Sequence, residues 1–235
     1  DGIYHEQLVI RSIPGSSAIN TVTFTSESGD STKAVLKIKP DAQKYASMVY
    51  MDGAENIGFR KLGLYTGTEL NFLNNAVYMI DCGNIRFENC NFQLWKESDI
   101  SIVIEESCED IIIKQSHFQS FNAKAVAVDA SGPSTRAVSI LDNKIIGATE
   151  WGVATMRFDE QARALIISGN RVGNCFRALY FLDTDTVQVG RNIIKNCNEG
   201  IIIDNGCSHY VISSNRISDL KSHANAQDGT NGISL

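Results

Sequence analysis

Acidic side chains stand just after a series of short apolar runs that recur along the chain. They are Asp81, Glu105, Glu106, Asp129, Asp183 and Asp204. Carboxylate oxygens are the hard ligands that Ca²⁺ prefers, so Asp81, Glu105, Glu106 and Asp129 are candidate calcium ligands. Arg157 lies within this row and could hold or deprotonate an acidic sugar. A solvated turn on the outside of a sheet is also rich in acids, and the sequence leaves both interpretations open.

Aromatic residues accompany the acidic row. Tyr50, Tyr78 and Tyr180 lie within apolar runs, whereas Trp95 and Trp151 lie in the polar segments between them. An aromatic ring offers an apolar face and, in Tyr, a polar tip, so these residues could contact the rings of a carbohydrate. Tyr50 and Tyr78 are one repeat apart, which places them close together. Ordinary packing under long loops is the alternative.

A repeated phrase shows how these residues are positioned. An Asn, one variable residue and an aliphatic residue recur at Asn143, Asn170, Asn192 and Asn215, at spacings of 27, 22 and 23 residues. A period in this range is typical of a solenoid. Asn tolerates a left-handed backbone, and in register its side chain can bond up and down the stack. We expect these four residues to form a structural ladder inside a bend.

The repeats predict strands. Each unit holds two short runs rich in Ile, Val, Phe and Tyr between turn formers, and no stretch sustains a helical period. One unit cannot bury its apolar face alone, and units that run in the same direction stack as parallel sheets. The sequence predicts an all-β solenoid of about eight coils of 22–28 residues. We expect one segment over residues 1–235, with irregular first coils in 1–45 and regular coils in 46–235. A leucine-rich repeat is disfavoured because its LxxLxL frame is missing.

Six cysteines are too few for a disulfide scaffold, and no CxxC pair is present. Cys175 and Cys197 are one repeat apart, as are Cys82 and Cys108. They are interpreted as small buried residues that stack between coils, or as strained disulfides between adjacent strands.

Charge and hydropathy exclude other classes of protein. The net charge of −6 argues against binding of nucleic acid, which requires clustered Lys and Arg. No apolar run approaches the ~20 residues needed for a transmembrane helix, and no signal peptide is present in these residues.

The chain resembles right-handed parallel β-helix proteins of the pectate-lyase-like superfamily. The Asn-x-aliphatic phrases and the opening Gly2-Ile3-Tyr4-His5-Glu6-Gln7-Leu8 carry the resemblance, and Asn20–Asp30 is similar to modules of bacterial surface and secreted β-helix proteins. The resemblance implies a right-handed coil and an extracellular or cell-surface location. Members usually carry terminal caps, and their absence here implies an excerpt of a larger protein with flanking domains.

The resemblance specifies chemistry poorly because the superfamily includes lyases, hydrolases, esterases and catalytically silent modules. The motifs of polygalacturonate hydrolases are absent, and the Asp and Arg residues of pectin methylesterases cannot be placed. The sequence favours a scaffold or carbohydrate-contacting module that is non-catalytic on its own. The alternative is a polysaccharide lyase, or another carbohydrate-active enzyme, that acts on an anionic polysaccharide with calcium.

Overall fold

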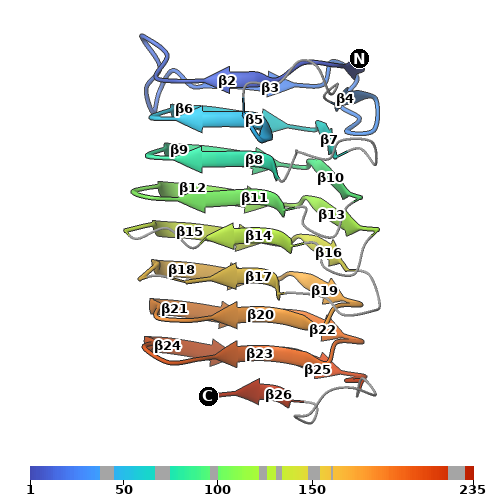
Figure 1. Ribbon diagram of the computed structural model, residues 1–235, viewed down its shortest axis with the longest axis vertical. Coiled ribbons are helices and arrows are strands. Elements are labelled where there is room, and N and C mark those ends of the chain that lie inside the picture. The colour runs from blue at the N-terminus through green and yellow to red at the C-terminus, as the bar shows by residue number, and fades with distance from the viewer. Residues whose placement is uncertain are drawn as a thin grey trace.

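The chain winds into a stack of coils made of three parallel sheets (Figure 1). The structure is a computed structural model that describes residues 1–37, 45–66, 75–95, 100–121, 126–130, 134–147, 154–159, 161–221 and 231–235. No helix occurs among these residues, and accordingly none that is long and apolar enough to cross a membrane. The predicted all-β parallel solenoid is confirmed.

We name the sheets A, B and C. Sheet A has nine strands: β1 (Gly2–Tyr4), β4 (Ala34–Leu36), β7 (Gly63–Tyr65), β10 (Asn91–Leu94), β13 (His117–Ser120), β16 (Lys144–Ile146), β19 (Arg171–Gly173), β22 (Ile193–Lys195) and β25 (Arg216–Ser218). Sheet B also has nine: β2 (Leu8–Ile10), β5 (Ser47–Asp52), β8 (Asn75–Ile80), β11 (Ile100–Glu105), β14 (Val126–Ala130), β17 (Ala154–Phe158), β20 (Arg177–Phe181), β23 (Glu199–Ile203) and β26 (Asn231–Ser234).

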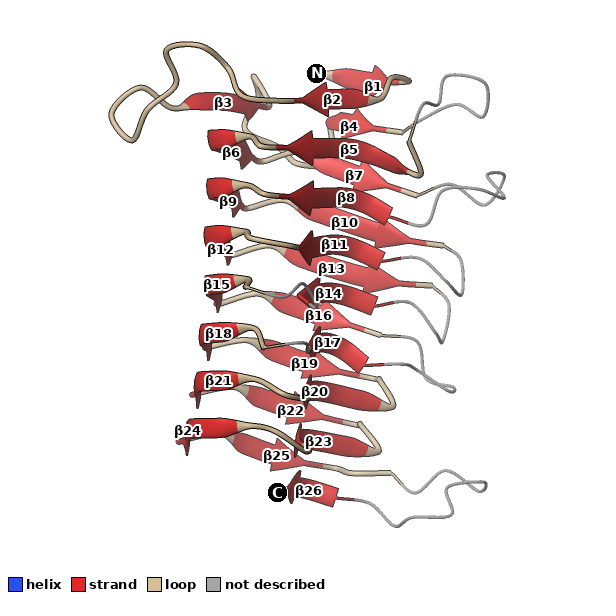
Figure 2. Cartoon of the chain, turned by 60° about the vertical axis from the view of Figure 1, so that its left-hand side comes forward, coloured by secondary structure: helices blue, strands red, loops and turns tan. Residues whose placement is uncertain are grey.

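Sheet C has eight strands: β3 (Val22–Thr25), β6 (Glu55–Arg60), β9 (Gly83–Glu88), β12 (Glu109–Lys114), β15 (Arg136–Leu141), β18 (Arg163–Ser168), β21 (Asp185–Gly190) and β24 (Ser208–Ser213). A full coil visits sheet B, then C, then A, and Figure 2 shows the same order repeated down the stack. Hydrogen-bonded side chains one coil apart are separated by 22 to 28 residues, which matches the expected length of a regular coil.

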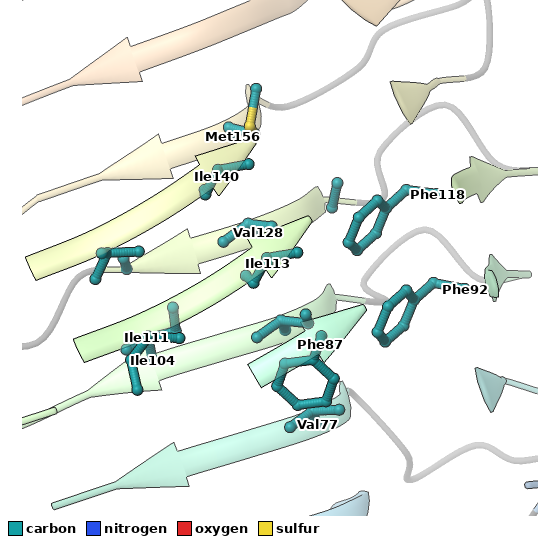
Figure 3. Close-up of a cluster of buried hydrophobic side chains, with 14 of the residues drawn as sticks. Val77, Phe87, Phe92, Ile104, Ile111, Ile113, Phe118, Val128, Ile140 and Met156 are labelled. Atoms are coloured by element: carbon teal, nitrogen blue, oxygen red, sulfur yellow. The ribbon is translucent and has the colours of Figure 1, made fainter. Parts of the chain in front are cut away.

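The core is a continuous column of stacked apolar side chains between the three sheets. Identical residue types lie above one another: the ring centroids of Phe92 and Phe118 are 4.5 Å apart, and those of Phe158 and Phe181 are 5.0 Å apart. Figure 3 shows the labelled phenylalanines and aliphatic residues pointing into the space between the sheets. Because each coil covers the apolar face of the next, burial is complete only in the stack.

The third strand of each coil differs from the sequence-based expectation of two strands. Strands of sheet A are three or four residues long, and each places a single central residue in the core, such as Phe118, Ile145 or Val172. One buried residue between two polar neighbours is too short a pattern for the period of a strand to be recognised. The segment that was predicted to be a turn and loop therefore contains sheet A.

Candidate functional site

Five of the predicted site residues lie in one column on the outer face of sheet B. Cα pairing joins Tyr50 to Tyr78, Asp129 to Arg157, and Arg157 to Tyr180, with one intervening valine between Tyr78 and Asp129. Residues on either side of these positions point into the core, so the column points away from it. The structure thus brings together residues that the sequence placed only on separate coils. We call this set the sheet B column.

A bidentate ion pair lies at the centre of the sheet B column. Arg157 Nε lies 3.2 Å from Asp129 Oδ1, and Arg157 Nη2 lies 2.5 Å from Asp129 Oδ2. The Asp129 side chain is 4% exposed and that of Arg157 is 38% exposed. The guanidinium therefore holds a buried carboxylate on one side and presents its other edge to solvent. Such a group can still donate hydrogen bonds to an anionic or hydroxylated ligand.

The tyrosines of the sheet B column have little free ring face. Tyr50 lies between Tyr45, at a centroid distance of 3.8 Å, and Tyr78, at 5.7 Å, with all three rings nearly parallel. The guanidinium carbon of Arg177 lies 4.8 Å from the centroid of Tyr180. The expected stacking of sugars on these faces is therefore wrong for Tyr50, because both of its faces contact other tyrosines. A ligand would meet ring edges and hydroxyls instead.

The hydroxyls of these tyrosines donate to carboxylates of the next coil. Tyr78 donates to Glu105, and Tyr180 donates to Asp204 Oδ2 at 3.1 Å. Burial raises the pKa of Tyr78, and the hydrogen bond to Glu105 raises it further. Burial and the bond to Asp204 raise the pKa of Tyr180 in the same way. Both hydroxyls stay protonated at neutral pH, so each carboxylate keeps an oriented donor.

The remaining acids of the predicted row have a backbone role. Asp81, Glu106 and Asp183 lie in turns between sheets B and C, with φ angles of 52°, 54° and 49°. Asp tolerates this left-handed region better than most residues, which explains why acids recur there. Among the described residues, no three His, Cys, Asp or Glu side chains converge to hold a metal ion. The geometry of the described residues therefore does not support the predicted calcium site.

The asparagine ladder is present as predicted. Each Asn Oδ1 accepts from the backbone N–H of the preceding ladder residue: Asn170 from Asn143 at 3.0 Å, Asn192 from Asn170 at 2.9 Å and Asn215 from Asn192 at 3.0 Å. The side-chain Nδ2 atoms donate along the same stack. Ser116 continues the ladder by donating its N–H to Asn143 Oδ1 at 2.8 Å. These residues hold the bend between sheets C and A.

Two aromatic and two sulfur contacts complete the survey. Trp95 stacks on Phe121 with centroids 4.0 Å apart, and both remain partly exposed. Phe121 was missed in the sequence because it follows a sheet A strand that was not recognised. Trp151 lies outside the described residues. The Sγ atoms of Cys175 and Cys197 lie 3.0 Å apart in the core, as the repeat spacing predicted.

These features define a class of protein. Residues 47–226 match the family described as "Right handed beta helix region". The chain belongs to this family, which confirms the right-handed coil.

Solved structures extend the comparison over almost the whole chain. A pectin methylesterase from Aspergillus niger superposes with a TM-score of 0.51 at 9% identity, over 98% of this chain and 78% of that one. PfbA, a surface adhesin of Streptococcus pneumoniae, gives a TM-score of 0.40 at 11% identity, over 97% of this chain and 72% of that one. At these identities the likeness concerns the fold alone. No curated protein sequence matches the chain.

Proposed function

We propose that this protein is an extracellular β-helix scaffold of a bacterial surface or secreted protein, that the outer face of sheet B contacts carbohydrate, and that the segment has no catalytic machinery of its own. The observation that carries the proposal is the sheet B column, in which Tyr50, Tyr78, Asp129, Arg157 and Tyr180 occupy one register position. Successive coils are ~4.8 Å apart, so these groups form a straight polar row along the axis.

Rigid polar groups favour this kind of recognition. Arg157 is fixed by its bidentate pair, and the hydroxyls of Tyr78 and Tyr180 are fixed by Glu105 and Asp204. Ordering of side chains on binding costs roughly 0.5–1.5 kcal/mol for each flexible group. A row that is already ordered avoids much of this cost. Linear glycans present hydroxyls at regular intervals and could bond several coils at once.

The test is a binding measurement with charge-matched variants. The double substitution Asp129→Asn with Arg157→Gln removes the ion pair without leaving a buried charge unpaired. We expect it to weaken glycan binding about tenfold or more in titration calorimetry against a panel of oligosaccharides. The control is Glu109→Gln with Arg136→Gln, because these two residues form an exposed ion pair on sheet C. Equal affinity for both double variants would refute the proposal.

A carbohydrate-active enzyme is the second candidate. It is favoured by the Asp–Arg pair on neighbouring coils and by the fold shared with a pectin methylesterase. The decisive assay incubates the protein with pectin and polygalacturonate, with added Ca²⁺ or with a chelator. Release of methanol, or formation of unsaturated ends that absorb in the ultraviolet, would establish an enzyme. Loss of either activity in the Asp129→Asn, Arg157→Gln variant would assign it to the sheet B column.

A further inference from the structure

Sheet A carries a second set of charged residues on its outer face. Lys144, Arg171, Lys195 and Arg216 come from the consecutive strands β16, β19, β22 and β25, which follow one another down the stack (Figure 2). Lys144 and Arg171 are paired in register, and Arg216 occupies the same position two coils beyond Arg171. All four are exposed. We call this set the basic track.

The basic track differs from the other two faces in how its charges are compensated. Every Lys or Arg ion pair among the described residues lies on sheet B or sheet C, such as Arg157 with Asp129 and Arg136 with Glu109. No carboxylate within the described ranges forms an ion pair with the basic track. Lys144 and Arg171 instead face each other, and like charges directly opposite in a sheet are destabilising. In a chain of net charge −6, this arrangement is not explained by folding.

The surface between these cations is shallow and apolar. A groove of about 330 Å³ is lined by Lys144, Ile146, Arg171, Gly173, Ile193 and Lys195. Cations thus border a floor of small and aliphatic residues. We propose that the basic track binds a linear acidic polysaccharide that lies along the solenoid axis. Its carboxylate or sulfate groups contact the cations, and its ring faces lie on the apolar floor.

Two observations favour a polysaccharide over other anions. An extended acidic peptide would need free backbone groups, but β19 and β22 pair with neighbours on both sides, so this part of the sheet has no open edge. A nucleic acid duplex or a membrane is broad and would also meet the flanking Asp142 and Asp219 and the overall negative charge. The strands of sheet A are three residues wide here, which suits one narrow chain. The site is separate from the sheet B column and goes beyond the function proposed above.

The experiment uses oligogalacturonate as the probe, with titration at about 50 and about 300 mM NaCl. Binding should weaken steeply as salt is added, because several anion contacts release counterions. Arg171→Gln with Lys195→Gln should reduce affinity about tenfold or more at the lower salt concentration. The matched control is Arg60→Gln with Lys114→Gln, which removes the same charge from sheet C and should reduce affinity less than threefold.

Folding of each variant is checked by its thermal midpoint. Removal of facing like charges should leave the midpoint of the Arg171→Gln, Lys195→Gln variant unchanged or raise it. Equal weakening by both double variants would show that only net charge matters and would overturn the proposal. So would an absence of binding at low salt, or tighter binding of oligothymidylate or of phosphatidylglycerol vesicles than of oligogalacturonate.

The variants also separate this site from the sheet B column. Asp129→Asn with Arg157→Gln should leave the salt-dependent binding of oligogalacturonate intact. If that variant abolishes it and the Arg171→Gln, Lys195→Gln variant does not, the acidic chain binds sheet B. The basic track is then overturned while the proposed function stands.

Discussion

Asn192 offers a quantitative test of the ladder. Its Oδ1 accepts from the backbone N–H and the Nδ2 of Asn170 at 2.9 and 3.0 Å, and its Nδ2 donates to the carbonyl of Ile167 and to Asn215 Oδ1, both at 2.9 Å. Asn192 is fully buried, so water does not replace these bonds. At about 1 kcal/mol for each bond, Asn192→Ala should lower the free energy of unfolding by about 4 kcal/mol.

The assay is thermal unfolding followed by circular dichroism. For a chain of 235 residues, about 4 kcal/mol corresponds to a lower midpoint by roughly 8–16 °C. The chain supplies its own control, because Ser116 occupies the ladder position of another coil, where its Oγ accepts from the N–H of Cys90 at 3.1 Å. Asn192→Ser should therefore keep the acceptor for Asn170 and lose only about half as much stability.

Binding of glycan to either face should be unchanged in the Asn192→Ala variant, because the ladder lies inside the bend and away from both surfaces. A loss below about 1 kcal/mol would refute the assignment of the ladder as a main source of stability. A Ser variant as damaged as the Ala variant would show that volume, rather than hydrogen bonding, decides the cost.

Further predictions concern other parts of the stack. The hydroxyl of Ser208 and a neighbouring imidazole lower the pKa of Asp185 to about 2. Its stabilising effect is present above the unfolded pKa of about 4 and is lost as the pH falls through about 2, so thermal midpoints of Asp185→Asn and the parent should differ at about pH 6 and converge at lower pH; a constant difference contradicts this. A Cβ at Gly200 would overlap a backbone carbonyl of the following coil, so Gly200→Ala should cost about 1–3 kcal/mol in urea unfolding, and an unchanged midpoint would show that the backbone relaxes freely. One molecule of oxidised glutathione should join Cys175 to Cys197 by thiol–disulfide exchange and release two of reduced glutathione. Alkylation of the denatured product should then label four of the six cysteines, whereas six labelled thiols would refute the contact.

The sequence predicted the stack because the residues that build it recur at the same place in every coil. Asn143, Asn170, Asn192 and Asn215 are readable as a series because each fills the same buried bend, where no other side chain makes the same bonds. Sheet A was missed for the opposite reason. Its strands contribute one core residue each, and a single aliphatic after an Asn resembles a turn.

The sheet B column was predicted in composition but not in detail. Repeat spacing was enough to bring Asp129 next to Arg157, since register follows from the coils. Residue type alone could not show that Asp81 adopts a positive φ as a turn former, or that both faces of Tyr50 are covered. These outcomes depend on backbone angles and ring orientation, which the spacing of residues does not encode.

The basic track was visible in the sequence and was not recognised. Lys144, Arg171 and Arg216 are the variable residue of the Asn-x-aliphatic phrase, between the ladder position and the core position. Because that residue changes from coil to coil, it was treated as filler. Its outward direction follows from the strand that begins there, and that strand was not predicted.

The asparagine ladder also divides each coil into a constant part and a part that can change in evolution. From Leu165 to Val172 and from Val187 to Ile194 the chain crosses the ladder bend in the same number of residues. Neighbouring ladder residues are nevertheless 27, 22 or 23 residues apart, so the difference falls outside this bend. An insertion in the bend would remove an Asn from its stack, whereas an insertion elsewhere leaves the register intact. The fold can therefore acquire new loops beside sheet B, and with them new ligands, without rebuilding its core.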